Sequence, residues 1–140
     1  MVKIYLDASV IIPAILSSAG GSAKLIKFVT LGLVAGVTSQ NVIEEIERNC
    51  VKIHKSPEEI RHFIHENSVL IRKKINPSDI AGYKDIPDTK DAHIIAAALL
   101  TKCTYLVTLD KKHLLGEDIK KRFLPLRIVS PKELLEEIVG

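Results

Sequence analysis

The sequence has no tryptophan, and its three tyrosines and three phenylalanines make up only 4% of the chain. It offers no evident platform of aromatic side chains for stacking nucleic-acid bases in sequence-specific recognition. The two cysteines, Cys50 and Cys103, are too few for a disulfide framework and favour a reducing compartment. The longest apolar run, 94–100, is far shorter than the ~20 residues that span a membrane. No signal peptide is recognisable, because the first apolar stretch turns polar at Asp7. We therefore expect a cytoplasmic protein with no membrane association.

A strong charge of one sign is also missing. Lysine and arginine number 20 against 17 aspartates and glutamates, a net charge of +3, which is compatible with a nucleic-acid partner without indicating one. Charged residues are 26% of the chain and hydrophobic residues 46%, which excludes disorder. A chain of 140 residues can bury about two-thirds of its unfolded surface. We predict one domain over residues 1–140.

Apolar runs and helical patterns alternate along the chain. The runs predict strands at 2–6, 35–38, 105–108 and 126–129. The helical patterns predict helices at 9–16, 22–33, 40–53, 57–71, 88–103 and 111–121, with a last one from 131. Capping-box patterns begin at Ser56 and Ser130, and the turn-rich segment 76–87 holds at most a short strand near Ile80. Strands separated by helices predict a three-layer α/β/α sandwich around a central parallel sheet.

Several acids lie at the predicted carboxyl ends of the strands, which is where open parallel sheets bind their ligands. Asp7 follows the first strand and Asp110 follows the strand at 105–108. Asp88 and Asp91 open the central helix one turn apart, and Glu45 lies early in the helix after the second strand. Carboxylates gathered in one crevice repel each other, and a site made of oxygen atoms suits Mg²⁺ or Mn²⁺. The joint pattern predicts a divalent-metal site.

Taken singly, these acids have simpler explanations, since Asp is a preferred helix N-cap and favours the first helical turn. The helix at 40–53 also offers three glutamates. At ~100° per residue, Glu44 points away from the apolar stripe, whereas Glu45 and Glu47 flank it. Periodicity leaves the choice between Glu45 and Glu47 open.

Five short motifs together resemble the PIN domain, a family of metal-dependent nucleases. They are Leu-Asp-Ala-Ser at 6–9, the segment 39–46 with its Glu-Ile pair, Asp-Thr-Lys-Asp-Ala-His-Ile at 88–94, Leu-Val-Thr-Leu-Asp at 106–110, and Ile-Val-Ser-Pro at 128–131. Each motif is weak alone, but their order and spacing over 3–138 are specific.

The resemblance implies an acidic quartet of Asp7, Glu45, Asp91 and Asp110, which would be both the catalytic residues and the metal ligands. Glu45 is selected because the family's acid precedes an aliphatic residue, here Ile46. Asp88 matches a frequent extra acid and is a secondary candidate. The sequence departs from many relatives after Asp110, where Lys111, Lys112 and His113 stand in place of a further acid.

The resemblance also implies an activity, a cofactor and partners. The activity is that of a Mg²⁺- or Mn²⁺-dependent endoribonuclease, which hydrolyses RNA to a 5′-phosphate and a 3′-hydroxyl. Stand-alone domains of this size are similar to VapC-type toxins, so an antitoxin protein and a homodimer or higher homo-oligomer are expected. Of the neighbouring residues, His93 could donate to substrate, and Lys111 and Lys112 could bind phosphates beside Asp110.

A protein without catalytic activity and two other α/β families are the alternatives to this interpretation. A catalytically silent PIN-like scaffold that binds RNA or protein would have no reason to keep the repelling acids together. A haloacid-dehalogenase-type phosphatase needs a second Asp two residues after Asp7, where this chain has Ser9. A phosphoacceptor receiver domain needs an acidic pair after the first strand, which is also missing.

Overall fold

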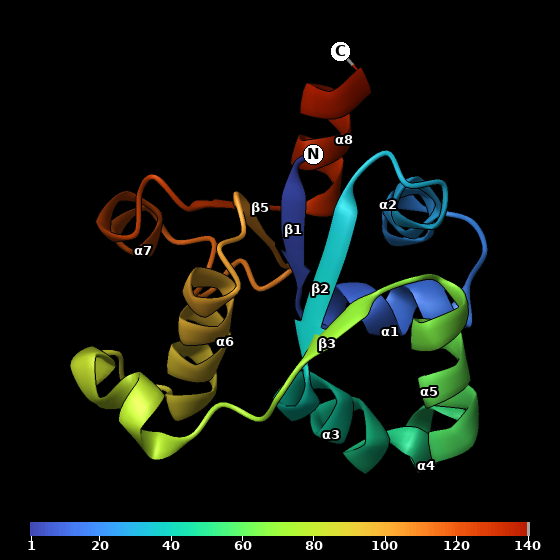
Figure 1. The fold of residues 1–140 in the computed structure, drawn as a ribbon, viewed down its shortest axis with the longest axis horizontal. Helices are drawn as coiled ribbons and strands as arrows, with labels where there is room; N and C mark the ends of the chain where they lie inside the picture. Colours follow the sequence, from blue (N-terminus) through green and yellow to red (C-terminus); the bar gives the residue numbers. More distant parts are fainter. Residues whose placement is uncertain (140) are drawn as a thin grey trace.

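The centre of the molecule is a five-stranded sheet in which all paired strands run parallel (Figure 1). The computed structural model describes residues 1–139. The strands are β1 (Lys3–Leu6), β2 (Ala35–Ser39), β3 (Leu70–Arg72), β4 (Tyr105–Val107) and β5 (Arg127–Val129). Their order across the sheet is β3-β2-β1-β4-β5, which places the first strand at the centre.

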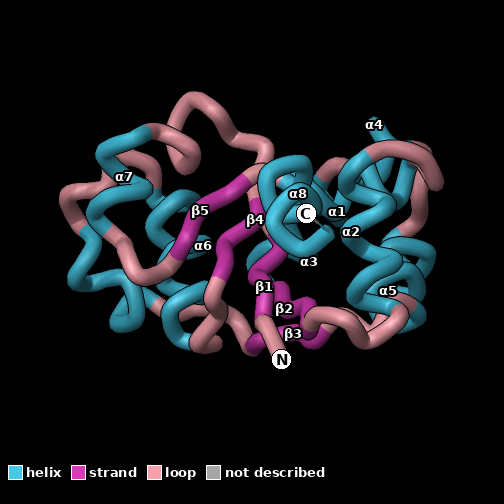
Figure 2. The backbone as a smooth tube through the Cα atoms, turned by 90° about the horizontal axis from the view of Figure 1, so that it is seen from above, coloured by secondary structure: helices cyan, strands magenta, loops and turns pink. Residues whose placement is uncertain are grey.

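Helices cover both faces of this sheet, as Figure 2 shows from above. They are α1 (Ala8–Leu16), α2 (Gly21–Thr30), α3 (Gln40–Arg48), α4 (Cys50–Ile53), α5 (Pro57–Glu66), α6 (Thr89–Leu100), α7 (Glu117–Arg122) and α8 (Pro131–Val139), with the 3-10 helix η1 at Pro77–Tyr83. Helices α6 and α7 lie on one face, and α1, α2, α3 and α5 lie on the other. The predicted α/β/α sandwich with a central parallel sheet is confirmed.

The core is aliphatic, as the scarcity of aromatic residues requires. Helix α6 buries a nearly continuous run from Ile94 to Ala98, which fits its apolar character on all sides. On the other face, α2 approaches β2 so closely that a Cβ on Gly36 would lie 2.8 Å from a methyl group of Val29. Glycine at this position lets the helix layer sit directly on the strand.

The predicted helices at 22–33 and 88–103 each end three residues early, at Thr30 and Leu100, and two helices between them differ more. The helix expected at 40–53 is interrupted at Asn49, which separates α3 from α4. The helix expected to carry Leu70 and Ile71 ends at Glu66, and these two residues lie in the edge strand β3, where they are 63% and 46% exposed. The chain turns at Ser68, whose φ of 60° is left-handed and stops the helix.

The segments on either side of the central helix also differ from expectation. The short strand expected near Ile80 is absent, because 77–83 forms the 3-10 helix η1. The charged helix expected at 111–121 begins only at Glu117, and residues 111–115 are turns. Both predicted capping boxes are present, at Ser56 and at Ser130.

No single helix among residues 1–139 has the length and apolar composition needed to cross a membrane. Helices α1 and α2 reach that threshold only when taken together, and they are bent by 94° at their junction.

Candidate active site

The acids gather at the topological switch point of the sheet. From β1 the chain first moves outward to β2 and β3, then returns across the sheet to β4 and continues to β5. The carboxyl ends of β1 and β4 therefore border a crevice of the kind in which open parallel sheets bind ligands. Asp7 follows β1 directly, and Asp110 lies in the loop that leaves β4.

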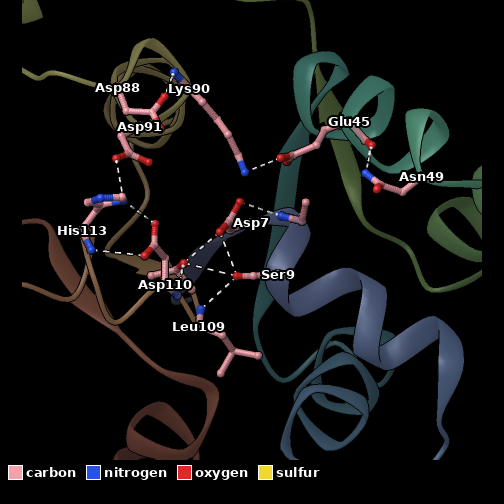
Figure 3. Close-up of polar contacts among 12 residues, drawn as sticks. Asp7, Ser9, Glu45, Asn49, Asp88, Lys90, Asp91, Leu109, Asp110 and His113 are labelled. Atoms are coloured by element: carbon pink, nitrogen blue, oxygen red, sulfur yellow. Dashed lines mark hydrogen bonds and ion pairs between the residues drawn. The ribbon is translucent and has the colours of Figure 1, made fainter. Parts of the chain in front are cut away.

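Asp7 is buried and is held by hydrogen bonds at both carboxylate oxygens. Its Oδ1 accepts from the backbone N–H of Ala8 at 2.7 Å, as the N-cap of α1. Its Oδ2 accepts from the hydroxyls of Ser9 and Thr108, both at 2.8 Å. The Ser9 oxygen in turn accepts from the backbone N–H of Leu109 at 2.9 Å (Figure 3). These bonds join the start of α1 to the loop after β4.

The same network positions Asp110. The hydroxyl oxygen of Thr108 accepts from the backbone N–H of Asp110 at 3.1 Å. The Oδ1 atom of Asp110 accepts from the N–H groups of Lys112 and His113, each at 3.2 Å, which closes a tight turn. Asp7 and Asp110 are therefore fixed relative to each other by one continuous set of hydrogen bonds.

Helix α6 brings two further acids to this crevice. Asp88 is the N-cap of α6 and accepts from the backbone N–H of Lys90, and Asp91 lies in the first turn. The Nδ1 atom of His113 lies 3.7 Å from Asp91 Oδ2 and 3.5 Å from Asp110 Oδ2. Asp88, Asp91 and His113 each offer a ligand atom, and these atoms lie within 4.8 Å of one another.

The fourth predicted acid, Glu45, reaches the crevice from α3 and forms an ion pair with Lys90 of α6. Figure 3 shows the Lys90 side chain crossing the space between the two helices, with Asp7 below it. Glu44 instead pairs with Lys74, and Glu47 pairs with Arg61 of α5. Of the two glutamates that periodicity leaves open, Glu45 pairs across the crevice with Lys90, whereas Glu47 pairs with Arg61.

Asp91 is the electrostatically strained member of the group. Asp91 is only 6% exposed, and the pKa of its carboxyl is raised to about 6. Burial is the largest cause, and the negative charges of Asp88 and Asp110 add to it. His113 and Lys90 oppose the shift without cancelling it. The pKa of Lys90 is raised, because its pairing with Glu45 outweighs the lowering effect of its burial.

This strain predicts a pH-dependent effect on stability. A carboxyl whose folded-state pKa exceeds its unfolded value costs stability as pH rises through that range, here from about 4 to about 6. We expect metal-free Asp91→Asn protein to melt above the wild type at pH 7.5 and level with it at pH 4. Thermal melts in EDTA at the two pH values measure the difference. A wild type more stable than the variant at pH 7.5 would contradict the prediction.

Several contributors to the site were not identified as such from the sequence. Lys90 and Thr108 belong to the motifs at 88–94 and 106–110, but no role is predicted for them there. His113 stands where many relatives carry an acid, and the sequence gives it no role either. The sequence offers one signal for their involvement, which is proximity to the acids. Lys90 directly precedes Asp91, and His113 lies three residues after Asp110. His93, expected to be able to reach substrate, lies 3.4 Å from the amide of Asn41, beside rather than within the acid group.

The donor set fits a hard divalent cation. It consists of carboxylate oxygens with one imidazole, and the Asp91 carboxylate is buried among like charges without a full countercharge. Magnesium and manganese prefer such oxygen-rich ligands.

Acids gathered at the switch point of a parallel α/β/α domain define a candidate site for a divalent metal. The sequence model described as PIN domain matches residues 3–112 of the chain. The protein therefore belongs to the PIN domain family, whose members are generally metal-dependent nucleases. A search of curated proteins gives no match.

Proposed function

We propose that this protein is a Mg²⁺- or Mn²⁺-dependent endoribonuclease whose catalytic residues are Asp7, Glu45, Asp91 and Asp110. The observation that carries the proposal is the buried Asp91 carboxylate, which is held between Asp88 and Asp110 with a raised pKa. Perturbed carboxyls of this kind cluster at functional sites, and a metal ion bound to these oxygens would offset the repulsion among them.

The acids have different roles in this proposal. Asp7, Asp91 and Asp110 would hold the metal, and the hydrogen bonds to Asp7 keep its oxygens in place before the metal binds. Glu45 would orient the attacking water from the opposite side of the crevice. The bound metal would supply an activated water and neutralise charge on the phosphate. Asp88 and His113 lie close enough to Asp91 to support it.

Basic side chains on both sides of the acids support a polyanionic substrate. Arg48, Lys74 and Lys90 line a pocket on the α3 side of the crevice, and Lys112 lines a second pocket together with Asp88 and Asp91. A strand of RNA crossing the carboxyl edge of the sheet would have its phosphates near lysines before and after the cut.

The activity is tested by incubating the purified protein with single-stranded and structured RNA in Mn²⁺, Mg²⁺ or EDTA. Cleavage in either metal with none in EDTA supports the proposal, provided that the products carry 5′-phosphates. Cleavage of single-stranded DNA in place of RNA would contradict the assigned substrate. RNA that binds but stays intact under all conditions would favour the silent scaffold.

The glutamates of α3 give a matched pair of variants. Glu45→Gln is expected to lower the cleavage rate tenfold or more, which corresponds to about 1.4 kcal/mol of barrier. Glu44→Gln should change the rate at saturating RNA little, because Glu44 pairs with Lys74 outside the acid group. Initial rates on one RNA substrate measure both. A silent Glu45→Gln variant would remove Glu45 from the catalytic set.

We also propose a toxin role with an antitoxin partner, in the manner of VapC-type proteins, and a homodimeric state. The support is the resemblance of motifs and size. Growth arrest on expression in a bacterium, absent with Asp91→Asn, tests the toxin role, and light scattering on the purified protein tests the dimer. Normal growth with active enzyme present would favour an RNA-processing role.

A further inference from the structure

A pocket of about 300 Å³ adjoins the acid group on its α3 side, and apart from Glu45 none of its lining residues has a catalytic role in the proposal above. Its lining includes Asn41 and Val42 of α3, His93 and Ile94 of α6, and the basic residues Arg48 and Lys74. Lys90 and Glu45, which also face the acids, form the boundary between the pocket and the acid group. The pocket is therefore continuous with the crevice in which the phosphate would be cut.

The polar groups inside this pocket are fixed by the fold. The Oδ1 atom of Asn41 accepts from the backbone N–H of Ile75 at 2.8 Å, which turns the Nδ2 group toward Nδ1 of His93 at 3.4 Å. Because the Asn41 amide is the donor in that contact, neutral His93 carries its proton on Nε2. Asn41 thus sets the tautomer of His93 and keeps its ring in place.

The remaining lining combines apolar surface with neutral hydroxyls. Val42 and Ile94 are buried residues that contribute apolar walls. The hydroxyls of Tyr5 and Ser39 pair with each other at 2.8 Å, and burial raises the pKa of Tyr5, so this pair remains uncharged. Such a pocket suits a flat heterocyclic ring, because the apolar walls can contact the faces of the ring and the polar groups can contact its edge.

The lining of the pocket carries three basic side chains, Arg48, Lys74 and Lys90, against two acidic ones, Glu44 and Glu45. Lys74 pairs with Glu44 at 3.1 Å, while Arg48 has no carboxylate within 4.0 Å among the residues of the structure that are described. If a ligand places its ring in the pocket, a negative group attached to that ring would lie near Arg48 and Lys74. A nucleotide has this combination of a heterocycle and a phosphate.

Resting on the function proposed above, we infer that this pocket binds one unpaired nucleotide of the RNA substrate next to the scissile phosphate. The base enters between Val42 and Ile94 and meets His93 and Asn41. Its phosphate lies near Arg48 and Lys74. A base in a duplex is stacked and paired and cannot enter, so the pocket selects single-stranded RNA and helps to set the position of the cut.

Binding without cleavage gives the first test. The full chain carrying Asp91→Asn is titrated in EDTA with a fluorescein-labelled, unstructured RNA hexamer and with a duplex of the same sequence. Adding His93→Ala or Lys74→Gln should weaken hexamer binding fivefold or more. The controls His65→Ala, on the exposed part of α5, and Lys73→Gln, outside the pocket lining, should change it less than twofold. Duplex binding should not depend on His93.

A spectroscopic readout then separates base binding from general attraction to phosphate. Ribonucleoside monophosphates added in EDTA should shift the ring proton signals of His93 and leave those of His65 in place, with inorganic phosphate as the reference. Loss of affinity in Lys74→Gln but not in His93→Ala, with no shift of the His93 signals, would overturn the inference and leave an electrostatic surface only.

Cleavage assays distinguish this inference from the proposed function. In the active protein, His93→Ala should raise KM and move the preferred cut, with kcat changed less than KM. If RNA is cleaved and His93→Ala changes neither KM nor cut position, the pocket inference fails and the nuclease function stands. If no RNA is cleaved but hexamer binding still depends on His93, the nuclease function fails and the nucleotide pocket stands.

Discussion

Asp91→Asn protein is expected to fold as the wild type does and to lose RNA cleavage by a factor of a thousand or more. The loss corresponds to about 4 kcal/mol of transition-state stabilisation. Asparagine has almost the shape of aspartate, so the packing of α6 changes little. The raised pKa of Asp91 means that its negative charge is less favourable in the fold than in the unfolded chain, and the variant carries no such charge. What is removed is the negative oxygen that would hold the metal.

The measurement compares initial rates on one labelled RNA at saturating Mn²⁺, with circular dichroism to verify the fold. Asp118→Asn is the matched control, because Asp118 is exposed in the first turn of α7, lines the same pocket as Asp91 and belongs outside the proposed quartet. It should keep its activity within a factor of two or three. A folded Asp91→Asn protein with wild-type activity would exclude Asp91 from the catalytic site.

Divalent metal is expected to raise the melting temperature of the wild type by several degrees. A ligand at a hundred times its dissociation constant adds about 2.7 kcal/mol, and each kcal/mol shifts the melting of a domain of this size by roughly 2–4 °C or more. The physical source is relief of repulsion among Asp7, Asp88, Asp91 and Asp110. The effect should be much smaller in Asp91→Asn, which has lost both the strain and the ligand.

Melting curves with Mn²⁺, Mg²⁺ or EDTA at constant ionic strength measure this effect. Sodium chloride at matched ionic strength is the control, because it screens surface charges without occupying a site. Wild type and Asp91→Asn shifting equally, or neither shifting, would show that the acids are helix caps and surface charges. The test needs no knowledge of the RNA target.

The acid group could be predicted from the sequence because its main members follow from topology. The carboxyl ends of parallel strands meet at one edge, so Asp7 and Asp110 were placed without knowledge of any contact. Lys90 could not be placed in the same way. Its partner Glu45 is on another helix, and their meeting depends on how α3 and α6 lie across the sheet edge, which local patterns do not encode.

The overextended prediction for α5 has its cause in one residue's backbone conformation. Ile71 continues the helical spacing of Ile60 and Ile64, so periodicity extended α5 too far. The helix stops because Ser68 adopts a left-handed conformation, and His54 ends α4 in the same way. Glycine commonly marks such positions, and serine and histidine give no such signal. The turn after Asp110 was missed for a different reason: Lys111 and Lys112 are compatible with a helix as well as with a turn.

The central position of β1 affects the timing of assembly during synthesis. Asp7 is among the first residues made, yet the Thr108 hydroxyl that holds it is 101 positions later in the chain. A nascent polypeptide that has emerged only as far as α5 can pair β1 with β2, but it lacks β4, Asp91 and Asp110. At 5–20 residues per second, the interval is several seconds. A chain being translated thus cannot complete the acid group until most of its length has left the ribosome.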